Sequence, residues 1–347
     1  MLYFRAASNI LKARLGAKVP LKDAAVHVEV LEEESVETVP PLAVLPGSLE
    51  RVTRGVPGHT TAAHQLKMAR MAEFRHAPVV HYVLPDCYVH RSGVEYRGGY
   101  WGSRGPLRQR FPKAPVAEVH EATFCMAPAA QTYFGHWLRD ACPTALLGQD
   151  RGRLLLDLRS DWPDAARYAT AFGLQAGPFG LLHVDELHVF SDHAQGQSKR
   201  ARYNLLRTRL AQNPALPHAT QRPVYLRRGA TGAARRIARE DQLCEVLDAQ
   251  GFDIIDMETV GFEERYRRLS AASVVVSIEG SHVNHAEFAM PAGSALILMI
   301  PGDRFTIVHR GVAHAIGLRF GCLILDPSSD GYVVAPKTIF DTIELVT

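Results

Sequence analysis

The fold of this chain is decided by the stretch Ser273-Val-Val-Val-Ser-Ile278-Glu-Gly-Ser281, an apolar run that ends in a glycine turn. The run is continuous rather than alternating, which is typical of a strand in a parallel sheet covered on both faces. The residues after it, 281–290, predict a helix that Pro291 and Gly293 end. A strand, a turn and a helix of this kind form half of a βαβ unit.

The same alternation extends in both directions from this stretch. Strands are predicted at 153–158, 187–190, 224–227, 252–256, 296–300 and 321–325, and helices at 133–147, 163–172, 202–212, 240–249 and 263–269. Residues 213–223 predict a linker, because three prolines interrupt the pattern there. We therefore expect an α/β protein with two Rossmann-like halves and a cleft between them.

The first third of the chain is patterned differently. Residues 79–84 predict a strand, and residues 87–96 predict a β-hairpin that turns at Arg91-Ser92-Gly93. Residues 1–60 are punctuated by turn sequences, which indicates loops around short strands.

The composition excludes several classes of protein. The chain has 347 residues, 47% of them hydrophobic, which is enough for two cores, and its net charge of +3 argues against a polyanion-binding protein. The five cysteines are scattered without a CxxC pair. That spacing argues against a disulfide framework or a zinc site and favours a reduced, cytoplasmic environment.

The N-terminal residues bear on membrane contact. They do not lead into a long apolar run, and no stretch approaches about 20 apolar residues, so we expect neither a signal peptide nor a membrane span. Residues 4–18 form a basic amphipathic stretch. It is either an ordinary solvated helix or a peripheral contact to the inner face of a membrane.

An arginine-rich loop follows the strand predicted at 224–227. Residues 222–239 hold six arginines and no acid, and Gly229 and Gly232 allow the backbone to approach a ligand closely. Ligands bind at the carboxyl ends of the strands in doubly wound sheets, and arginines bind phosphate oxygens in pairs. The loop is therefore either an anion site or a solvated basic loop. Nucleic acid is disfavoured, because the cluster is short and holds no stacking aromatic residues.

Two further motifs carry candidate chemistry. Glu279-Gly280-Ser281 joins the strand predicted at 273–278 to a helix. Ser281 can cap this helix, and main-chain N–H groups at its start can bind an anion. The alternative is an ordinary strand–turn–helix junction. His136 and Asp140 are four residues apart on a predicted helix, so they lie on one face. They form either a general base or a structural hydrogen bond.

Missing motifs narrow the ligand. The chain has no Asp-x-Asp, no G-x-x-x-x-G-K-[ST], no G-x-G-x-x-G and no G-x-S-x-G. These absences disfavour a metal-carried donor, ATP hydrolysis, dinucleotide binding and a serine-hydrolase elbow. A diphosphate held by protein charges, without a metal or other cofactor, agrees with all of them.

Four motifs, in this order, resemble glycosyltransferase family 61, many of whose members are capsular polysaccharide biosynthesis proteins. They are His136-Trp-Leu-Arg-Asp140 with Pro143, Tyr225-Leu-Arg-Arg228 with Arg235-Arg-Ile237 and Glu240-Asp241, Gly251-Phe252 with Glu258, and Ser277-Ile-Glu-Gly-Ser281 with Asn284-His285, Phe288 and Met290-Pro-Ala-Gly293. The likeness extends over roughly residues 120–325.

The resemblance implies a GT-B fold, with an acceptor-side domain at 1–215 and a nucleotide-sugar-binding domain at 216–347. It implies a metal-independent, inverting transferase that moves a hexose or pentose from a nucleotide-sugar to a glycan or polysaccharide. The implied catalytic residues are His136 and Asp140. The implied donor-binding residues are Arg227, Arg228, Arg235, Arg236, Glu258, Glu279, Gly280, Ser281, His282 and His285.

The chain departs from the family pattern at Ser277, where glycine is usual, and at Asn284-His285, where the two residue types are exchanged. These departures leave a second function open, a non-catalytic nucleotide- or glycan-binding subunit of a polysaccharide assembly complex. In the enzyme hypothesis, Asp140 or His136 deprotonates an acceptor hydroxyl, and the arginines stabilise the leaving diphosphate.

Overall fold

The computed structural model describes residues 19–102, 117–213, 221–229 and 235–347. The basic amphipathic stretch at the N-terminus, most of the predicted linker and Gly232 lie outside the described residues. The chain divides into two compact units. Unit 1 comprises residues 1–35 and 76–209, and unit 2 comprises residues 36–75 and 210–347.

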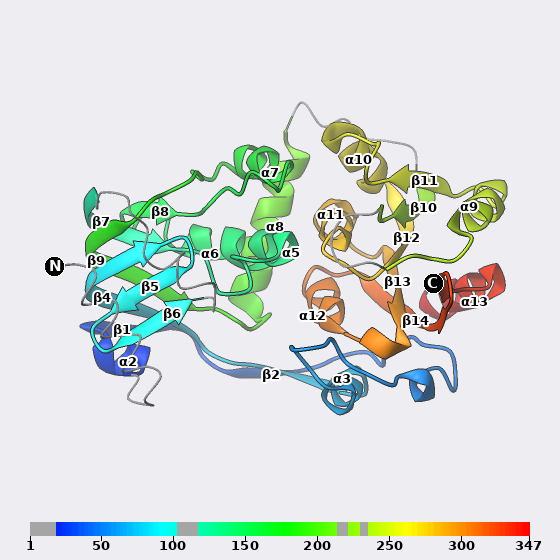
Figure 1. The fold of residues 1–347 in the computed structure, drawn as a ribbon, viewed down its shortest axis with the longest axis horizontal. Helices are drawn as coiled ribbons and strands as arrows, with labels where there is room; N and C mark the ends of the chain where they lie inside the picture. Colours follow the sequence, from blue (N-terminus) through cyan, green and yellow to red (C-terminus); the bar gives the residue numbers. More distant parts are fainter. Residues whose placement is uncertain (1–18, 103–116, 214–220, 230–234) are drawn as a thin grey trace. The chain divides into compact units, whose positions relative to one another are not determined.

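Unit 2 is built on a six-stranded sheet in the order β11-β10-β12-β13-β14-β15 (Figure 1). Its strands are β10 (Arg222–Arg227), β11 (Asp253–Asp256), β12 (Ala272–Ile278), β13 (Ala295–Pro301), β14 (Arg319–Ser328) and β15 (Gly331–Val333). The first five strands are parallel, and β15 pairs antiparallel with β14. This is the 2-1-3-4-5 order of doubly wound sheets, in which the connections change direction between β10 and β12.

Helices cover both faces of this sheet, as the continuous apolar strands predicted. The helices α9 (Glu240–Ala249) and α13 (Pro336–Val346) lie on one face, and α10 (Phe262–Leu269), α11 (Val283–Ala289) and α12 (Val308–Ala315) lie on the other (Figure 1). Leu247 and Ile339 pack against the sheet in the hydrophobic core that lies beneath α9 and α13. The Rossmann-like prediction is therefore confirmed for this part of the chain.

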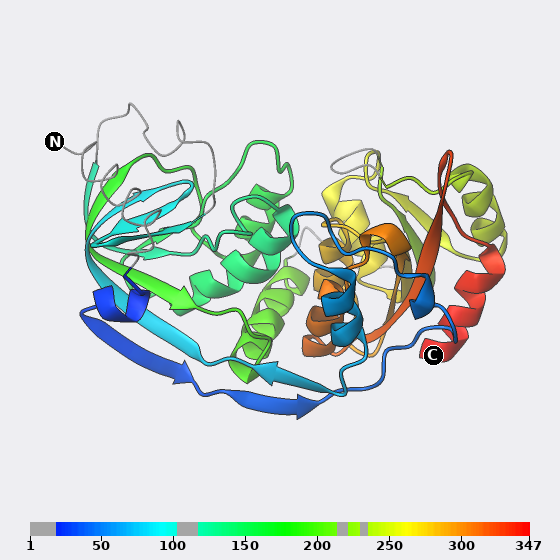
Figure 2. The ribbon, with the colours of Figure 1, turned by 60° about the horizontal axis from the view of Figure 1, so that its bottom comes forward.

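Residues 36–75 also pack within unit 2. They contain the short helices η1 (Leu49–Arg51) and α3 (Ala62–Ala69), next to the strand pair β2 (Ser35–Thr38) and β3 (Glu73–His76) (Figure 2). Arg310 of α12 is buried and donates to the main-chain carbonyls of Pro40, Met68, Ala69 and Met71. These bonds hold the segment in place, so unit 2 is not a single stretch of sequence. The functional division near residue 215 stays a prediction.

Unit 1 contains a mixed sheet in the order β6-β5-β4-β9-β7-β8, with β1 paired to β4. Its strands are β1 (His27–Glu32), β4 (Val79–His90), β5 (Gly93–Tyr96), β6 (Gly99–Gly102), β7 (Ala117–Phe124), β8 (Arg153–Leu155) and β9 (Leu182–Ser191). The predicted hairpin is confirmed as β4 and β5. Only β9, β7 and β8 run parallel, whereas β4 pairs antiparallel with β1, β5 and β9.

This sheet is mixed, whereas the second Rossmann-like half that we expected would be parallel. Tight turns such as the one between β4 and β5 can join only antiparallel neighbours. The α/β class is confirmed, and a GT-B arrangement stays a prediction. The helices of unit 1 are α2 (Leu21–Ala24), α5 (Phe134–His136), η2 (Trp137–Ala141), α6 (Cys142–Leu147), α7 (Ala165–Phe172) and α8 (Gln197–Ala211). Gly173 ends α7 with a φ of 66°, as its position predicted.

All five cysteines lie in described residues and are free thiols. Among the described helices, none is long and apolar enough to cross a membrane. The elements that were not predicted from the sequence are α3, β3, β6, β7, α12, β15 and α13.

Candidate functional site

The carboxyl ends of β10 and β12 lie side by side, because the two strands are paired with Leu226 beside Ser277. Arg228 follows β10 directly, and its Nη1 donates to the main-chain carbonyl of Glu279 at 3.2 Å. Arg235 donates to the same carbonyl at 2.6 Å and also forms an ion pair with the Glu279 carboxylate. Two arginines from the predicted loop therefore converge on the predicted glycine turn, at the edge where doubly wound sheets bind ligands.

Two glycines make this approach possible. A Cβ on Gly280 would lie 2.6 Å from Nη1 of Arg228, so only glycine leaves room for the guanidinium. Gly229 has a φ of +77°, and a Cβ there would collide with the side chain of Glu258. The structure thus places exposed Glu258 beside the loop after β10.

Burial disfavours the charges of both arginines. Burial lowers the pKa of Arg228 to about 10, and the neighbouring charges of Arg235 and Arg304 add to this shift. Burial also lowers the pKa of Arg235, with Glu279 opposing the shift and Arg304 adding to it. The Nε atoms of Arg235 and Arg304 are buried without a hydrogen-bond partner among the described residues. A bound anion would supply both partners and relieve the repulsion.

The other two predicted loop arginines lie elsewhere. Arg227 pairs with Asp241 of α9 at 2.8 Å and lies 3.5 Å from Glu240. Its charge is therefore compensated by the start of α9. Arg236 is exposed, and its main-chain carbonyl accepts a hydrogen bond from Tyr332 of β15. Neither contact joins these arginines to Glu279.

His282 lies directly against the arginine pair. Its Nε2 lies 2.8 Å from the hydroxyl of Ser277, which in turn donates to the carbonyl of Leu226 at 2.7 Å. Because that hydroxyl has one proton, His282 is the donor to it, and its Nδ1 keeps a lone pair. Burial and the charge of Arg228 lower the pKa of His282 well below its usual value, so the ring is neutral. Ser277, a departure from the family pattern, thus orients His282.

The helix after the turn begins later than predicted. It starts at Val283, and Ser281 makes no side-chain cap. Instead, the Asn284 amide donates to the Ser281 carbonyl at 3.0 Å. The expectation that Ser281 caps this helix is wrong.

His285, the other predicted histidine of this turn, is buried with its Nε2 3.5 Å from Arg265. Burial and the charge of Arg265 lower the pKa of His285 well below its usual value.

Three residues of this edge were missed from the sequence. Arg304 lies three residues after β13, at the same carboxyl edge, and collecting every basic residue just after a parallel strand would have found it. Glu287 is fully buried and accepts from Nδ1 of His309 at 2.8 Å, while Nε2 of His309 lies 3.9 Å from Glu279. No local sequence pattern links α11 to α12, so this pair could not be predicted.

In unit 1, the predicted pair of His136 and Asp140 is present, with 2.6 Å between Nδ1 and Oδ2. It lies across a π-helical turn, residues 137–141, a distortion that is frequent at functional sites. Trp137 is completely buried and donates to the carbonyl of Asp157, which fixes the turn. Arg139 lies 2.9 Å from Nε2 of His136.

Asp140 is held ionised by its neighbours. The fully buried Lys199 of α8 lies 3.3 Å from Asp140 and also donates to the carbonyl of Asp192 at 2.9 Å. The Asp192 carboxylate accepts two hydrogen bonds from Arg202. Although burial alone would raise the pKa of Asp140, Lys199 and His136 lower it well below its usual value. Such a carboxylate is a poor proton acceptor and a good anchor for His136.

A comparison with family models bears on the middle part of the chain. Residues 134–297 match the sequence model described as Glycosyltransferase 61. These residues belong to glycosyltransferase family 61. The resemblance read from the four motifs is thereby confirmed, and the family implies transfer of a sugar from a donor to an acceptor. A search of the curated proteins found no match to the chain.

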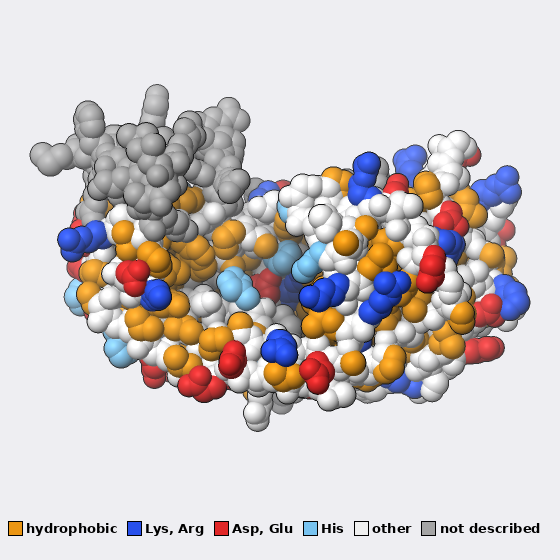
Figure 3. Space-filling model, turned by 90° about the horizontal axis from the view of Figure 1, so that it is seen from below, with side chains coloured by type: hydrophobic (Ala, Val, Ile, Leu, Met, Phe, Trp, Pro, Cys, Tyr) orange, Lys and Arg blue, Asp and Glu red, His pale blue; other side chains and the backbone are white. Residues whose placement is uncertain are grey.

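The family 61 region contains every predicted site residue, from His136 to His285, whereas Arg304 and His309 lie beyond it. The basic groups of the site are gathered at one sheet edge rather than spread over a surface. On the face shown in Figure 3, the Lys and Arg side chains of the described residues are interspersed with acidic and apolar ones.

Proposed function

We propose that this chain is a metal-independent, inverting glycosyltransferase that moves a hexose or pentose from a nucleotide-sugar to a glycan or polysaccharide acceptor. The observation that carries the proposal is the convergence of buried Arg228 and Arg235 on Glu279 at the switch point of the unit 2 sheet. In this proposal the arginines bind the donor diphosphate. Glu258 lies towards the nucleoside, and Glu279, Gly280, Ser281, His282 and His285 surround the donor.

The arginines also have a catalytic purpose. When the bond between the anomeric carbon and the diphosphate oxygen breaks, negative charge develops on the leaving diphosphate. Fixed cations in a buried site stabilise that charge more strongly than water does. The donors left open on Arg235 and Arg304 add to this stabilisation.

Proton transfer is assigned to His136 within the same proposal. Asp140 accepts the Nδ1 proton, so Nε2 carries a lone pair. Arg139 lies 2.9 Å from Nε2, and in this proposal it gives way to the acceptor hydroxyl, whose proton Nε2 then takes. The acceptor oxygen bonds to the anomeric carbon as the diphosphate leaves from the opposite side, which inverts the configuration. The lowered pKa of Asp140 supports this assignment, because an ionised partner stabilises the imidazolium that forms.

The setting that we propose is polysaccharide biosynthesis in the cytoplasm, with a GT-B arrangement of the two units. The second candidate, a non-catalytic nucleotide- or glycan-binding subunit, is favoured by the exchanged Asn284-His285. In the structure, Asn284 contacts Ser281 and His285 contacts Arg265. These local contacts suit a structural role of the two residues as well as a catalytic one.

A donor screen distinguishes the two functions. A thermal-shift screen with UDP-, GDP-, CMP- and dTDP-sugars selects the donor, since a ligand that binds the folded state raises its melting temperature. Mass spectrometry then follows release of the free nucleotide from that donor over hours. Slow hydrolysis supports the enzyme, whereas stabilisation without turnover on any glycan acceptor supports the binding subunit.

A further inference from the structure

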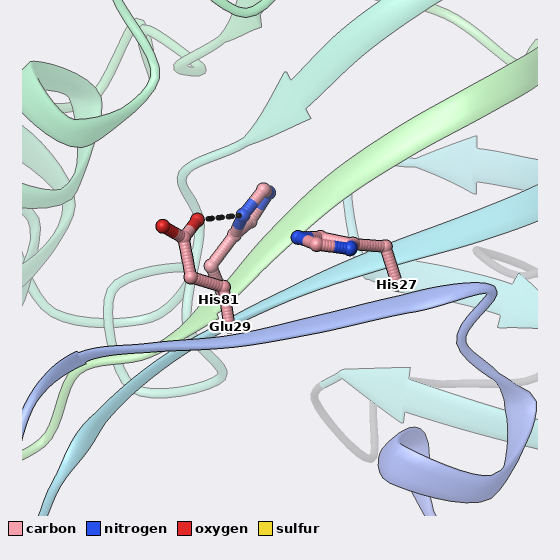
Figure 4. Close-up of side chains that lie close together, drawn as sticks. All are labelled: His27, Glu29 and His81. Atoms are coloured by element: carbon pink, nitrogen blue, oxygen red, sulfur yellow. Dashed lines mark ion pairs between the residues drawn. The ribbon is translucent and has the colours of Figure 1, made fainter.

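A second cluster of polar side chains lies on the sheet of unit 1, away from the residues of the predicted site. His27 and Glu29 lie two residues apart on β1, so they point to the same face of the sheet (Figure 4). Glu29 is directly opposite His81 of β4 in the strand register. One ligand atom from each of these three side chains lies within 4.8 Å of the other two.

Hydrogen bonds behind the cluster decide which nitrogen of His81 carries a proton. His188 of β9 lies 2.9 Å from Glu121 through Nε2, and a carboxylate can only accept, so His188 donates. In a neutral ring, Nδ1 of His188 is then an acceptor, and it lies 2.9 Å from Nε2 of His81. His81 therefore donates from Nε2, which leaves a lone pair on its Nδ1.

That lone pair faces a carboxylate. His81 is 3% exposed, and its Nδ1 makes no hydrogen bond within the described residues. The nearest acidic atom is Oε2 of Glu29, at 3.5 Å. Two acceptors that face each other at this distance repel, unless a cation lies between them.

We propose that His27, Glu29 and His81 bind a divalent transition-metal ion, Zn²⁺ in particular. Two imidazoles and one carboxylate suit this ion, and three protein ligands leave its fourth tetrahedral position open to water or an anion. His81 is hydrogen-bonded to His188, which is hydrogen-bonded to Glu121. Such bonds fix the ring of a histidine that binds a metal through its other nitrogen. His27 and Glu29 are exposed and can rotate towards the ion.

The neighbouring triad of Glu121, Glu186 and His188 is a weaker candidate. Its one histidine already uses both nitrogens, towards His81 and towards Glu121. Arg151 also lies near enough to lower the pKa of His81, and its charge opposes a cation. The carboxylates of Glu29, Glu121 and Glu186 together outweigh that single charge.

Zinc at this place would tie β1 to β4. It involves none of the residues assigned to sugar transfer, so the proposal does not depend on metal-independent catalysis. The spacing of the cysteines argued against a cysteine-based zinc site. It gives no information about histidines that only strand pairing brings together.

The test uses the full-length chain without an affinity tag, first treated with a chelator. Zinc is titrated in competition with a chromogenic chelator, bound zinc is counted by elemental analysis, and Co²⁺ is added separately to read its visible spectrum. We expect one zinc per chain and a tetrahedral Co²⁺ spectrum. His27→Gln and Glu29→Gln, both at exposed positions, should each weaken zinc binding by more than about tenfold.

The matched control is His183→Gln, which removes a histidine of β9 that is already paired with Asp86 and Glu118. It should leave zinc affinity unchanged. The proposal is overturned if the wild-type chain binds no zinc in the titration. It is also overturned if His27→Gln and Glu29→Gln bind zinc as tightly as the control does. It is also overturned if only Glu121→Gln, and not Glu29→Gln, removes the ion, since the metal would then lie at the neighbouring triad.

Discussion

The two units hold their buried charges in opposite ways. In unit 1, Asp140 faces Lys199, and Asp192 is bound by both terminal nitrogens of Arg202. In unit 2, Arg228 and Arg235 share one residue, Glu279, and a third arginine lies near enough to lower the pKa of both. The first network pairs each carboxylate with a cation, whereas in the second the Nε atoms of Arg235 and Arg304 are buried without a hydrogen bond to any described residue.

The two charge networks suit different roles in our proposal. A compensated network fixes geometry, and that is what a proton-accepting histidine needs from its neighbours. An undercompensated cluster of arginines is unfavourable for folding, which is the usual consequence of building a binding site. This comparison agrees with our proposal that unit 2 binds the diphosphate and that unit 1 positions His136.

The largest effect is expected at His136. Replacing it as His136→Gln removes the proton acceptor, so kcat for transfer should fall by about 10²- to 10⁴-fold with little change in donor KM. Steady-state kinetics with the donor selected by thermal shift measure both. His120→Gln, an exposed histidine of β7, is the control and should retain full kcat. A His136→Gln enzyme with wild-type kcat would remove unit 1 from the chemistry.

The arginine cluster should give the next largest effect. Arg235→Gln removes a charged donor to Glu279, and nucleoside diphosphate affinity should fall by about 10- to 100-fold. Isothermal calorimetry measures the loss. Arg222→Gln, at the opposite end of β10, makes the same change of charge on an exposed residue and should bind normally. Equal losses in both variants would mean that net charge, not the buried cluster, binds the ligand.

A pH-dependent loss of stability is expected at Asp140. Its folded-state pKa is lowered, so its contribution is complete above its unfolded pKa of about 4 and is lost as the pH falls further. Asp140→Asn should cost about 1–3 kcal/mol in the free energy of unfolding at neutral pH, because Lys199 loses a partner.

Urea unfolding of Asp140→Asn and wild type measures the difference, which should shrink as the pH is lowered below about 4. Asp185→Asn, an exposed control, should show no such loss. A difference that is the same at all pH values would contradict the assigned ion pair.

The smallest effect is expected at Ser277. Ser277→Ala removes the hydroxyl between Leu226 and His282 and should lower the free energy of unfolding by about 1 kcal/mol. Because His282 loses the bond that orients its ring, donor KM should rise a few-fold with kcat nearly unchanged. Thermal unfolding and steady-state kinetics give the two numbers. Unchanged values of both would leave this departure from the family pattern without a role.

The sequence predicted the parallel sheet of unit 2 well, because continuous apolar runs and glycine stops leave few alternatives to it, but it did not predict the helices α3, α12 and α13 of this unit. It also predicted that Arg228, Arg235 and Glu279 lie together, since strand order alone brings the ends of β10 and β12 to one edge. It did not predict that Arg227 and Arg228 have different partners. The two neighbours are both arginines, and only the directions of their side chains in the structure distinguish them.

Contacts that join distant elements were beyond prediction. Lys199 meets Asp140 only after α8 packs on the π-helical turn, and His81 meets Glu29 only after β1 pairs with β4. The mixed sheet of unit 1 was missed for the same reason. Its antiparallel half resembles, in sequence, a set of separate loops and hairpins.

The central claim is that the unit 2 cluster binds a diphosphate. The most direct test is calorimetric titration of the wild-type chain with a nucleoside, its monophosphate and its diphosphate, for both uridine and guanosine. We expect the diphosphate of the preferred base to bind at least about tenfold more tightly than its monophosphate, and the nucleoside to bind most weakly. Equal affinities across the series, or no binding of any diphosphate, would contradict the account.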